Sequence, residues 1–194
     1  MIIQSILDTD LYKFTTSYAY MKLYPDAEGT FTFNDRDNTE YTEEFLSELR
    51  LALCNMGGLY LSDREKEWCI ANIRFIPQFY WEWLSYFYYD YSKINVELDE
   101  NKHLRIEVTD KLYKVTLYEV PILALVSQLR NKMLGNHVNM EEVINRLIPK
   151  ISLSNINGLN FSEFGTRRRF SAAVQDEVIK FIKEHSTYCT GTSN

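Results

Sequence analysis

Residues 159–194 read LNFSEFGTRRRFSAAVQDEVIKFIKEHSTYCTGTSN, and this stretch decides the predicted fold. Residues 159–164 are typical of a short buried strand, and the turn 165–169 follows at once. Apolar residues then recur at three- and four-residue steps, as on the buried face of a helix: Phe170, Val174, Val178, Phe181 and Ile182. A second strand is predicted from residue 188 to 190. Strand, loop, helix and strand together predict a right-handed crossover unit and an α/β fold.

The two turns of this unit carry the candidate chemistry. The first, GTRRR at 165–169, lies where a strand hands over to a helix, so its N–H groups and guanidinium groups would face an anion such as phosphate or carboxylate. The second, GTSN at 191–194, follows the next strand and is expected at the same edge. Two plainer interpretations stay open: a solvated basic turn that pairs with surface carboxylates, and an ordinary polar turn.

The preceding sequence is predicted to alternate between helices and strands. We expect helices at 8–24 (capped by Asp8, Thr9 or Asp10), 42–54, 62–74 with a Ser62–Glu65 capping box, 121–134 starting at Pro121, and 139–148. We expect a strand at 30–33, a hairpin of 94–98 with 103–108, and a further strand at 112–117. A change from β-rich to helical sequence near 110–120 predicts two domains, 1–115 and 116–194.

Residues 79–91 contain nine aromatic side chains. The preferred interpretation is a packed helix whose hydroxyl groups reach the surface. A platform that stacks nucleic-acid bases is the alternative, and it is disfavoured because Lys93 is the one basic residue nearby.

Composition excludes several classes of protein. The chain of 194 residues has 21 basic and 27 acidic side chains and a net charge of −6, which argues against a nucleic-acid partner. Its three cysteines are far apart, so neither a disulfide framework nor a zinc site is predicted, and a reduced, cytoplasmic setting is expected. We expect no signal peptide and no membrane partner. The three histidines, His103, His137 and His185, are expected to be structural or superficial.

Four sequence blocks resemble the amino-terminal part of the nicotinate phosphoribosyltransferases, and the resemblance covers the whole chain. They are LDTDLYK at 7–13, FTFNDR at 31–36, YEVPILA at 118–124, and EFGTRRRFS at 163–171 leading to GTSN at 191–194. The resemblance implies an α+β amino-terminal domain followed by the first strands of an irregular α/β barrel, as in type II phosphoribosyltransferases.

The resemblance also implies a reaction. The family converts nicotinate and phosphoribosyl pyrophosphate into nicotinate mononucleotide and pyrophosphate, an entry step of NAD salvage. ATP hydrolysis drives the reaction through a phosphorylated histidine, and Mg²⁺ assists the departure of pyrophosphate. We therefore expect an ATP-coupled enzyme with Mg²⁺ and ATP as cofactors, acting as a homodimer with shared active sites.

The resemblance assigns roles to individual residues. Tyr12 would stack on the pyridine ring from the partner subunit, and Phe164 would cover the other face of the ring. Arg167 would hold the phosphoribosyl or pyrophosphate anion as the catalytic residue. Arg36, acting across the dimer, and Arg168 are expected to bind phosphate. The remaining substrate-binding residues are Gly165, Thr166, Thr192, Ser193 and Asn194.

Ser193 and the missing histidine bear on substrate and activity. Relatives that use nicotinamide have an acidic residue where Ser193 stands, and an acid there would repel a carboxylate, so Ser193 favours nicotinate. The family's phosphorylated histidine follows the GTSN block, so residues 1–194 are expected to be an inactive fragment. The alternatives are a sister enzyme that uses nicotinamide, or a non-catalytic module that binds anions or a partner.

Overall fold

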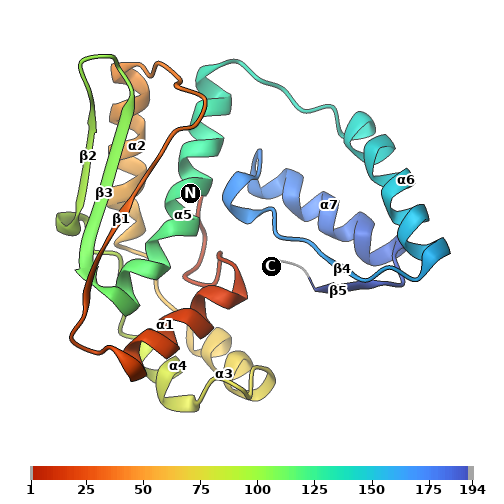
Figure 1. The fold of residues 1–194 in the computed structure, drawn as a ribbon, viewed down its shortest axis with the longest axis horizontal. Helices are drawn as coiled ribbons and strands as arrows, with labels where there is room; N and C mark the ends of the chain where they lie inside the picture. Colours follow the sequence, from red (N-terminus) through yellow and green to blue (C-terminus); the bar gives the residue numbers. More distant parts are fainter. Residues whose placement is uncertain (1, 192–194) are drawn as a thin grey trace.

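The computed structural model describes residues 2–191, which form two regions (Figure 1). The first region, called the body, comprises residues 2–133, and the second, called the crossover unit, comprises residues 140–191. In chain order the elements are α1 (Leu11–Leu23), β1 (Glu28–Thr32), α2 (Glu43–Met56), α3 (Asp63–Asn72), α4 (Gln78–Leu84), the 3₁₀ turn η1 (Tyr91–Lys93), β2 (Ile94–Leu98), β3 (Leu104–Lys111), α5 (Leu112–Met133), α6 (Met140–Asn157), β4 (Phe161–Ser162), the 3₁₀ turn η2 (Thr166–Arg168), α7 (Ala172–His185) and β5 (Cys189–Gly191).

The body is built on an antiparallel sheet of three strands in the order β1-β3-β2. The predicted hairpin is confirmed, because β2 pairs with β3 and Ile94 lies opposite Val108. Asp99 closes its turn by accepting backbone N–H bonds from Asn101 and His103, both at 2.9 Å. Alternate residues of β3 are buried, as period-two sequence predicts, so one face of the sheet meets the helices of the body.

The first three helices lie close to their predicted positions. They differ from one another in whether a side chain caps the first turn. Ser62 and Glu65 form the predicted capping box at α3, and Thr42 caps α2. The helix predicted from residue 8 begins at Leu11, and Asp10 is its N-cap residue without a side-chain capping bond. The prediction that the Asp10 carboxylate caps this helix is therefore wrong, and its side-chain oxygens accept no capping hydrogen bond.

Helix α5 corrects two predictions at once. Residues 112–117, predicted as a strand, are its first turns, and Pro121, predicted as a helix start, lies inside it. The ladder of β3 ends where the Leu112 N–H bonds to the Ala27 carbonyl at 2.8 Å, and the chain turns into a helix there. A proline inside a helix costs about 3 kcal/mol. Burial of Leu117, Val120 and Ile122 against the core favours the continuous helix by a comparable or larger amount.

The aromatic segment is helical only over its first half. Helix α4 ends at Leu84, so the predicted packed helix over residues 79–91 is wrong beyond that point. Tyr80 and Trp81 are fully buried and lie edge to face with a centroid distance of 5.5 Å, while Tyr86 is 85% exposed. Helix α5 also runs without a break across residue 115, where the division into two domains was placed. That division stays a prediction.

The crossover unit has the predicted order of strand, helix and strand, and β4 pairs with β5 in parallel. Its strands are short, and β4 is not buried: Phe161 is half-buried and Ser162 is exposed, which contradicts the predicted buried strand. Among residues 2–191 this sheet has two strands, so it has no interior strand to cover. Helix α6 is longer than the predicted 139–148 and ends at a left-handed Gly158 (φ 64°).

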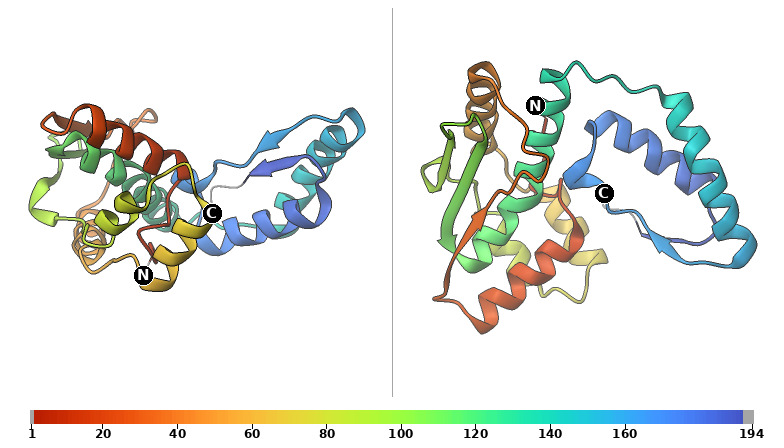
Figure 2. Two further views of the ribbon diagram at one scale, coloured as in Figure 1. Left: turned by 90° about the horizontal axis from the view of Figure 1, so that it is seen from below. Right: turned by 45° about the horizontal axis from the view of Figure 1, so that its top comes forward.

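A buried ion pair joins the crossover unit to the amino-terminal segment of the body. The guanidinium group of Arg169, 5% exposed, donates to both oxygens of Asp8 at 2.6 and 2.7 Å. It also donates to the Ile2 carbonyl and to the side-chain oxygen of Gln175. The hydroxyl of Ser127 on α5 donates to the Arg169 carbonyl at 3.0 Å. These bonds fix the turn before α7 against the amino-terminal segment and α5 (Figure 2).

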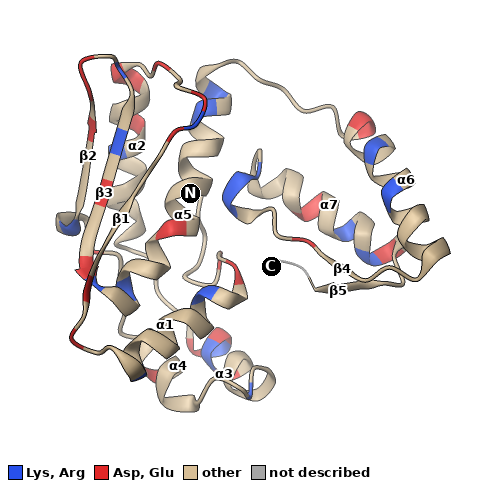
Figure 3. Ribbon diagram, in the orientation of Figure 1, with Lys and Arg blue, Asp and Glu red and all other residues tan. Residues whose placement is uncertain are grey.

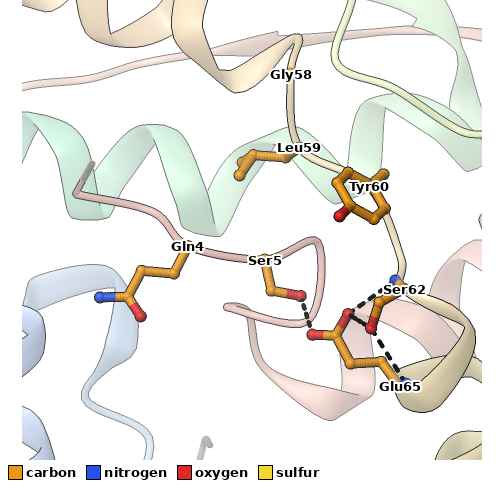
Figure 4. Close-up of a pocket in the computed structure, with 7 residues that line it drawn as sticks. All are labelled: Gln4, Ser5, Gly58, Leu59, Tyr60, Ser62 and Glu65. Carbon is orange, nitrogen blue, oxygen red and sulfur yellow. Dashed lines mark hydrogen bonds between the residues drawn. The ribbon is translucent and has the colours of Figure 1, made fainter.

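The amino-terminal segment is tied in turn to α3. The hydroxyl of Ser5 donates to Glu65 at 2.5 Å, beside the capping box (Figure 4). A cavity of about 460 Å³ lies at this contact and is lined by Gln4, Ser5, Gly58, Leu59, Tyr60, Ser62 and Glu65. Within residues 2–191 no helix is long and apolar enough to cross a membrane.

Candidate active site

The centre of the candidate site is a carboxylate shared by two cations. Arg167, on the turn η2, donates from Nη1 to Oε1 of Glu119 on α5 at 3.2 Å. Lys13 on α1 pairs through Nζ with the other oxygen, Oε2, of the same carboxylate. Figure 3 shows the basic turn before α7 pointing toward the middle of α5 and the start of α1. The Arg167 side chain is 38% exposed, so its remaining donors are within reach of a ligand.

Asp10 is a buried carboxyl group beside this cluster. It is 1% exposed, and within residues 2–191 neither of its oxygens has a hydrogen-bond partner. Burial raises the pKa of Asp10, Arg167 and Lys13 act to lower it, and Glu163 and Glu119 act to raise it. Because burial outweighs the nearby cations, Asp10 holds its proton more readily than an ordinary aspartate.

Tyr12 and Phe164 lie together at the rim of the site. They are 38% and 56% exposed, and their ring centroids are 6.4 Å apart at an interplanar angle of 62°. A slot for a flat heteroaromatic needs two nearly parallel faces, whereas these rings meet edge to face. One chain alone therefore does not form the slot. The expectation that Tyr12 serves the partner subunit's site stays a prediction.

Gly165 and Thr166 form the inner side of the turn. Thr166 is fully buried, and its hydroxyl accepts a hydrogen bond from Gln175 Nε2 at 3.0 Å. This bond orients the hydroxyl toward α7, so Thr166 supports the turn from within the protein. The helix does not follow the turn directly, because Arg169 and Ser171 have extended backbone and Ser171 caps α7 by accepting from the Val174 N–H.

The three consecutive arginines do not act as one anion clamp. Arg169 forms the buried ion pair with Asp8, and Arg167 donates a hydrogen bond to Glu119. Arg168 is exposed. The prediction that three guanidinium groups face one anion is therefore wrong for Arg169. Its partner is 161 residues away in the chain, which no local pattern reveals.

Arg36 lies in an exposed loop far from Arg167 of the same chain. The neighbouring Asp37 pairs with Arg130 of α5 at 2.9 Å, whereas Arg167 pairs with Glu119, eleven residues earlier on that helix. At 1.5 Å per residue these anchoring points are about 16 Å apart. The neighbour of Arg36 and Arg167 itself are thus anchored at different points of α5, and a role for Arg36 across a dimer stays a prediction.

The second predicted turn lies largely outside the described residues, since Thr192, Ser193 and Asn194 fall beyond Gly191. The chain that leads to them is in place, because the Gly191 carbonyl accepts the Glu163 N–H at 3.0 Å. Strands β4 and β5 therefore end at the same edge, directly before residues 163 and 192. The ends of the two strands lie side by side, and the position of the second turn beside the first stays a prediction.

Sequence reasoning missed the shared carboxylate and its buried lysine. Lys13 and Glu119 both belong to the sequence blocks that carry the resemblance, but no role was assigned to either. A signal was present for Lys13, a charged residue next to apolar positions of the predicted helix 8–24, whereas Glu119 lies between the predicted strand 112–117 and the predicted helix 121–134. Such a residue needs an ionic partner when its helix is buried. Their pairing depends on the contact between α1 and α5.

Comparison with known families decides the affiliation of the chain. Residues 7–127, well over half of the chain, match the family described as nicotinate phosphoribosyltransferase (NAPRTase) N-terminal domain. Residues 159–194 match the nicotinate phosphoribosyltransferase (NAPRTase) family. The chain belongs to the nicotinate phosphoribosyltransferase family. The predicted resemblance is thereby confirmed.

Curated relatives and solved structures agree with this affiliation. A nicotinate phosphoribosyltransferase of Desulforapulum autotrophicum is 33% identical across the whole chain, and one of Methanosarcina acetivorans is also 33% identical. The chain spans about half of their lengths, 50% and 52%. A nicotinate phosphoribosyltransferase structure from Porphyromonas gingivalis matches the whole chain and 50% of its own with TM-score 0.95 and 41% identity. A putative nicotinate phosphoribosyltransferase from Saccharomyces cerevisiae matches the whole chain and 51% of its own at TM-score 0.86 and 27% identity. These likenesses confirm the predicted α/β fold class.

Proposed function

We propose that this chain contributes to the formation of nicotinate mononucleotide and pyrophosphate from nicotinate and phosphoribosyl pyrophosphate, as an entry to NAD in the cytoplasm. The family affiliation of the chain supports the proposal. The structural observation that carries it is Arg167, a partly exposed guanidinium group held by a single nitrogen at the end of β4. Such a group offers its other donors to a phosphate or carboxylate.

In the proposed mechanism the pyridine nitrogen displaces pyrophosphate at the anomeric carbon of the ribose. Arg167 stabilises charge on the phosphate oxygens as the bond to the leaving group breaks. Phe164 supplies one aromatic face for the pyridine ring, and Tyr12 of a second copy supplies the other. Within one chain Tyr12 and Phe164 meet edge to face, so the homodimer belongs to the proposal through the family alone.

Magnesium and ATP belong to the proposal through the family alone. Residues 2–191 contain no group of three side chains suited to hold a metal ion, so we assign no protein magnesium site to them. Mg²⁺ commonly binds through substrate phosphates with few protein ligands. None of the three histidines occupies the place of the family's phosphorylated histidine. His185, for instance, bonds to the Phe181 carbonyl at 2.9 Å.

The proposal is tested by titrating residues 1–194 with nicotinate mononucleotide in a calorimeter. The chain spans about half of its relatives, so binding is the suitable measurement for it. Arg167→Ala should weaken binding at least tenfold, because one charge-assisted contact contributes about 1.5–3 kcal/mol. Lys180→Ala removes an exposed charge from α7, the helix that follows this turn, and serves as the control. If the unaltered chain did not bind nicotinate mononucleotide, or if both variants lost equal affinity, the result would favour a non-catalytic module that binds another anion or a partner.

Ser193 is proposed to select nicotinate over nicotinamide. Replacing it by Asp puts a second negative charge beside the nicotinate carboxylate, which costs on the order of several kcal/mol in a desolvated site. Ser193→Asp should sharply lower kcat/KM for nicotinate and improve the relative use of nicotinamide in steady-state assays with both substrates. An unchanged preference would leave Arg167 as the residue that recognises the carboxylate.

A further inference from the structure

We propose that Lys13 is a positioning residue that keeps Arg167 available to the anionic substrate by occupying one oxygen of the carboxylate that Arg167 also contacts. The inference rests on the proposed function of Arg167 as the anion-binding residue. It assigns a role to a buried lysine on α1 that does not itself touch the substrate.

The geometry of Glu119 is the first support. Its carboxylate gives one oxygen to each cation: Oε2 to Lys13 Nζ and Oε1 to Arg167 Nη1. The side chains become more exposed from Lys13 at 7% to Glu119 at 26% and Arg167 at 38%. The lysine therefore closes the inner end of the cluster, and the arginine faces the outside.

The preferred geometry of arginine explains why the lysine matters. A guanidinium group and a carboxylate pair most strongly through two parallel hydrogen bonds. Here Arg167 makes only one bond to Glu119, and in the described part of the chain this is its one side-chain acceptor. With Lys13 absent, both oxygens of Glu119 would be open to Arg167. A pair with two hydrogen bonds would occupy the Arg167 donors that an anionic ligand needs.

The surrounding charges strengthen this effect. Asp10 and Glu163 also face the cluster, together with Glu119, Lys13 and Arg167. With all of them ionised the five groups sum to −1, and without Lys13 they sum to −2. An incoming phosphate or carboxylate would meet greater repulsion. Removing Lys13 and Glu119 together restores the sum to −1 and leaves Arg167 without a competing carboxylate at Glu119.

The test measures the Kd of nicotinate mononucleotide by calorimetry on residues 1–194. Lys13→Met should weaken binding about tenfold, the effect of losing one charge-assisted contact. The double variant Lys13→Met with Glu119→Gln should return to within about twofold of the unaltered chain. Lys22→Met, which removes an exposed charge from the same helix, is the matched control and should change nothing.

A folded Lys13→Met variant that binds normally, or a double variant as weak as the single one, would overturn the inference. Should Lys13→Met fail to fold, Glu119→Gln is compared with the double variant. The double variant should bind less than fivefold more weakly than Glu119→Gln, because Lys13 then has no carboxylate to occupy and only its charge is lost. A fivefold gap between them would contradict the role of Lys13. Failure of the proposed function is a different outcome: the unaltered chain does not bind, or Arg167→Ala binds as well as it does.

Discussion

The body and the crossover unit are held together by different kinds of interaction. The hydrophobic core lies wholly in the body and extends along the chain from Ile3 to Leu129. The buried residues of the crossover unit are few, and more than half of them are polar: Ile151, Ser154, Thr166, Arg169, Gln175, Ile179 and Ile182. The unit thus depends on directional bonds at its junction with the body rather than on a core of its own.

This difference bears directly on the site. Apolar burial is strong but non-directional, whereas paired charges fix geometry at a modest net gain in stability. Arg169, which anchors the crossover unit to Asp8, is two residues from Arg167. The same turn therefore carries the structural anchor and the candidate anion-binding residue. Loss of the anchor should displace the site without unfolding the body.

The largest effect is expected for a core residue of the body. Trp81 is fully buried and packs edge to face on Phe14 at 5.5 Å. Trp81→Ala should lower the free energy of unfolding by about 3–5 kcal/mol, measured by urea denaturation. Trp68, which is 58% exposed on α3, provides the matched control. If Trp68→Ala cost as much, burial would not explain the stability of the body.

A smaller and more local effect is expected at the junction. Asp8→Asn removes the charge from the Arg169 pair and leaves a buried guanidinium group without its counter-ion, at a cost of about 3 kcal/mol. Amide hydrogen exchange should accelerate in η2 and α7 and stay unchanged in β2 and β3. Asp176→Asn alters an exposed carboxylate in the same unit and should leave exchange as it was. Uniform acceleration across both regions would contradict the division.

The smallest effect concerns the tie between the amino-terminal segment and α3, and it depends on pH. Burial acts to raise the pKa of Glu65, but hydrogen bonds from Ser5 and Ser62 outweigh it and lower the pKa below its ordinary value. The ionised form therefore stabilises the fold above the unfolded-state pKa, and this stability is lost as pH falls through the lowered value. Glu65→Gln should cost about 1 kcal/mol at pH 7, and this cost should shrink as pH falls through the lowered pKa of Glu65.

Urea denaturation at a series of pH values checks this expectation. Glu67→Gln, at an exposed position of the same helix, is the control and should follow the unaltered chain. A gap between Glu65→Gln and the unaltered chain that stayed constant with pH would show that the carboxylate charge plays no part in the tie.

The sequence predicted where the turn of the candidate site lies in the fold. It did not predict which residues the arginines of that turn contact. The motif at 163–171 and the crossover pattern placed the turn at the strand edge where the structure has it. They did not separate Arg167 from Arg169, because adjacent residues of one type look alike in sequence. Their partners, Glu119 and Asp8, lie 48 and 161 residues away. The role of each arginine depends on those distant carboxylates.

The sequence by itself determined the features that short-range physical chemistry controls. The Ser62–Glu65 box, the Asp99 turn and the alternation of β3 depend on neighbours within a few residues, so local patterns predict them. The tertiary structure decided the rest. Residues 112–117 have strand-like composition, and Pro121 suits a helix start, yet both lie within α5. The reason is that one long helix can contact α1, α2 and the sheet together, and the apolar surface buried there outweighs local preference.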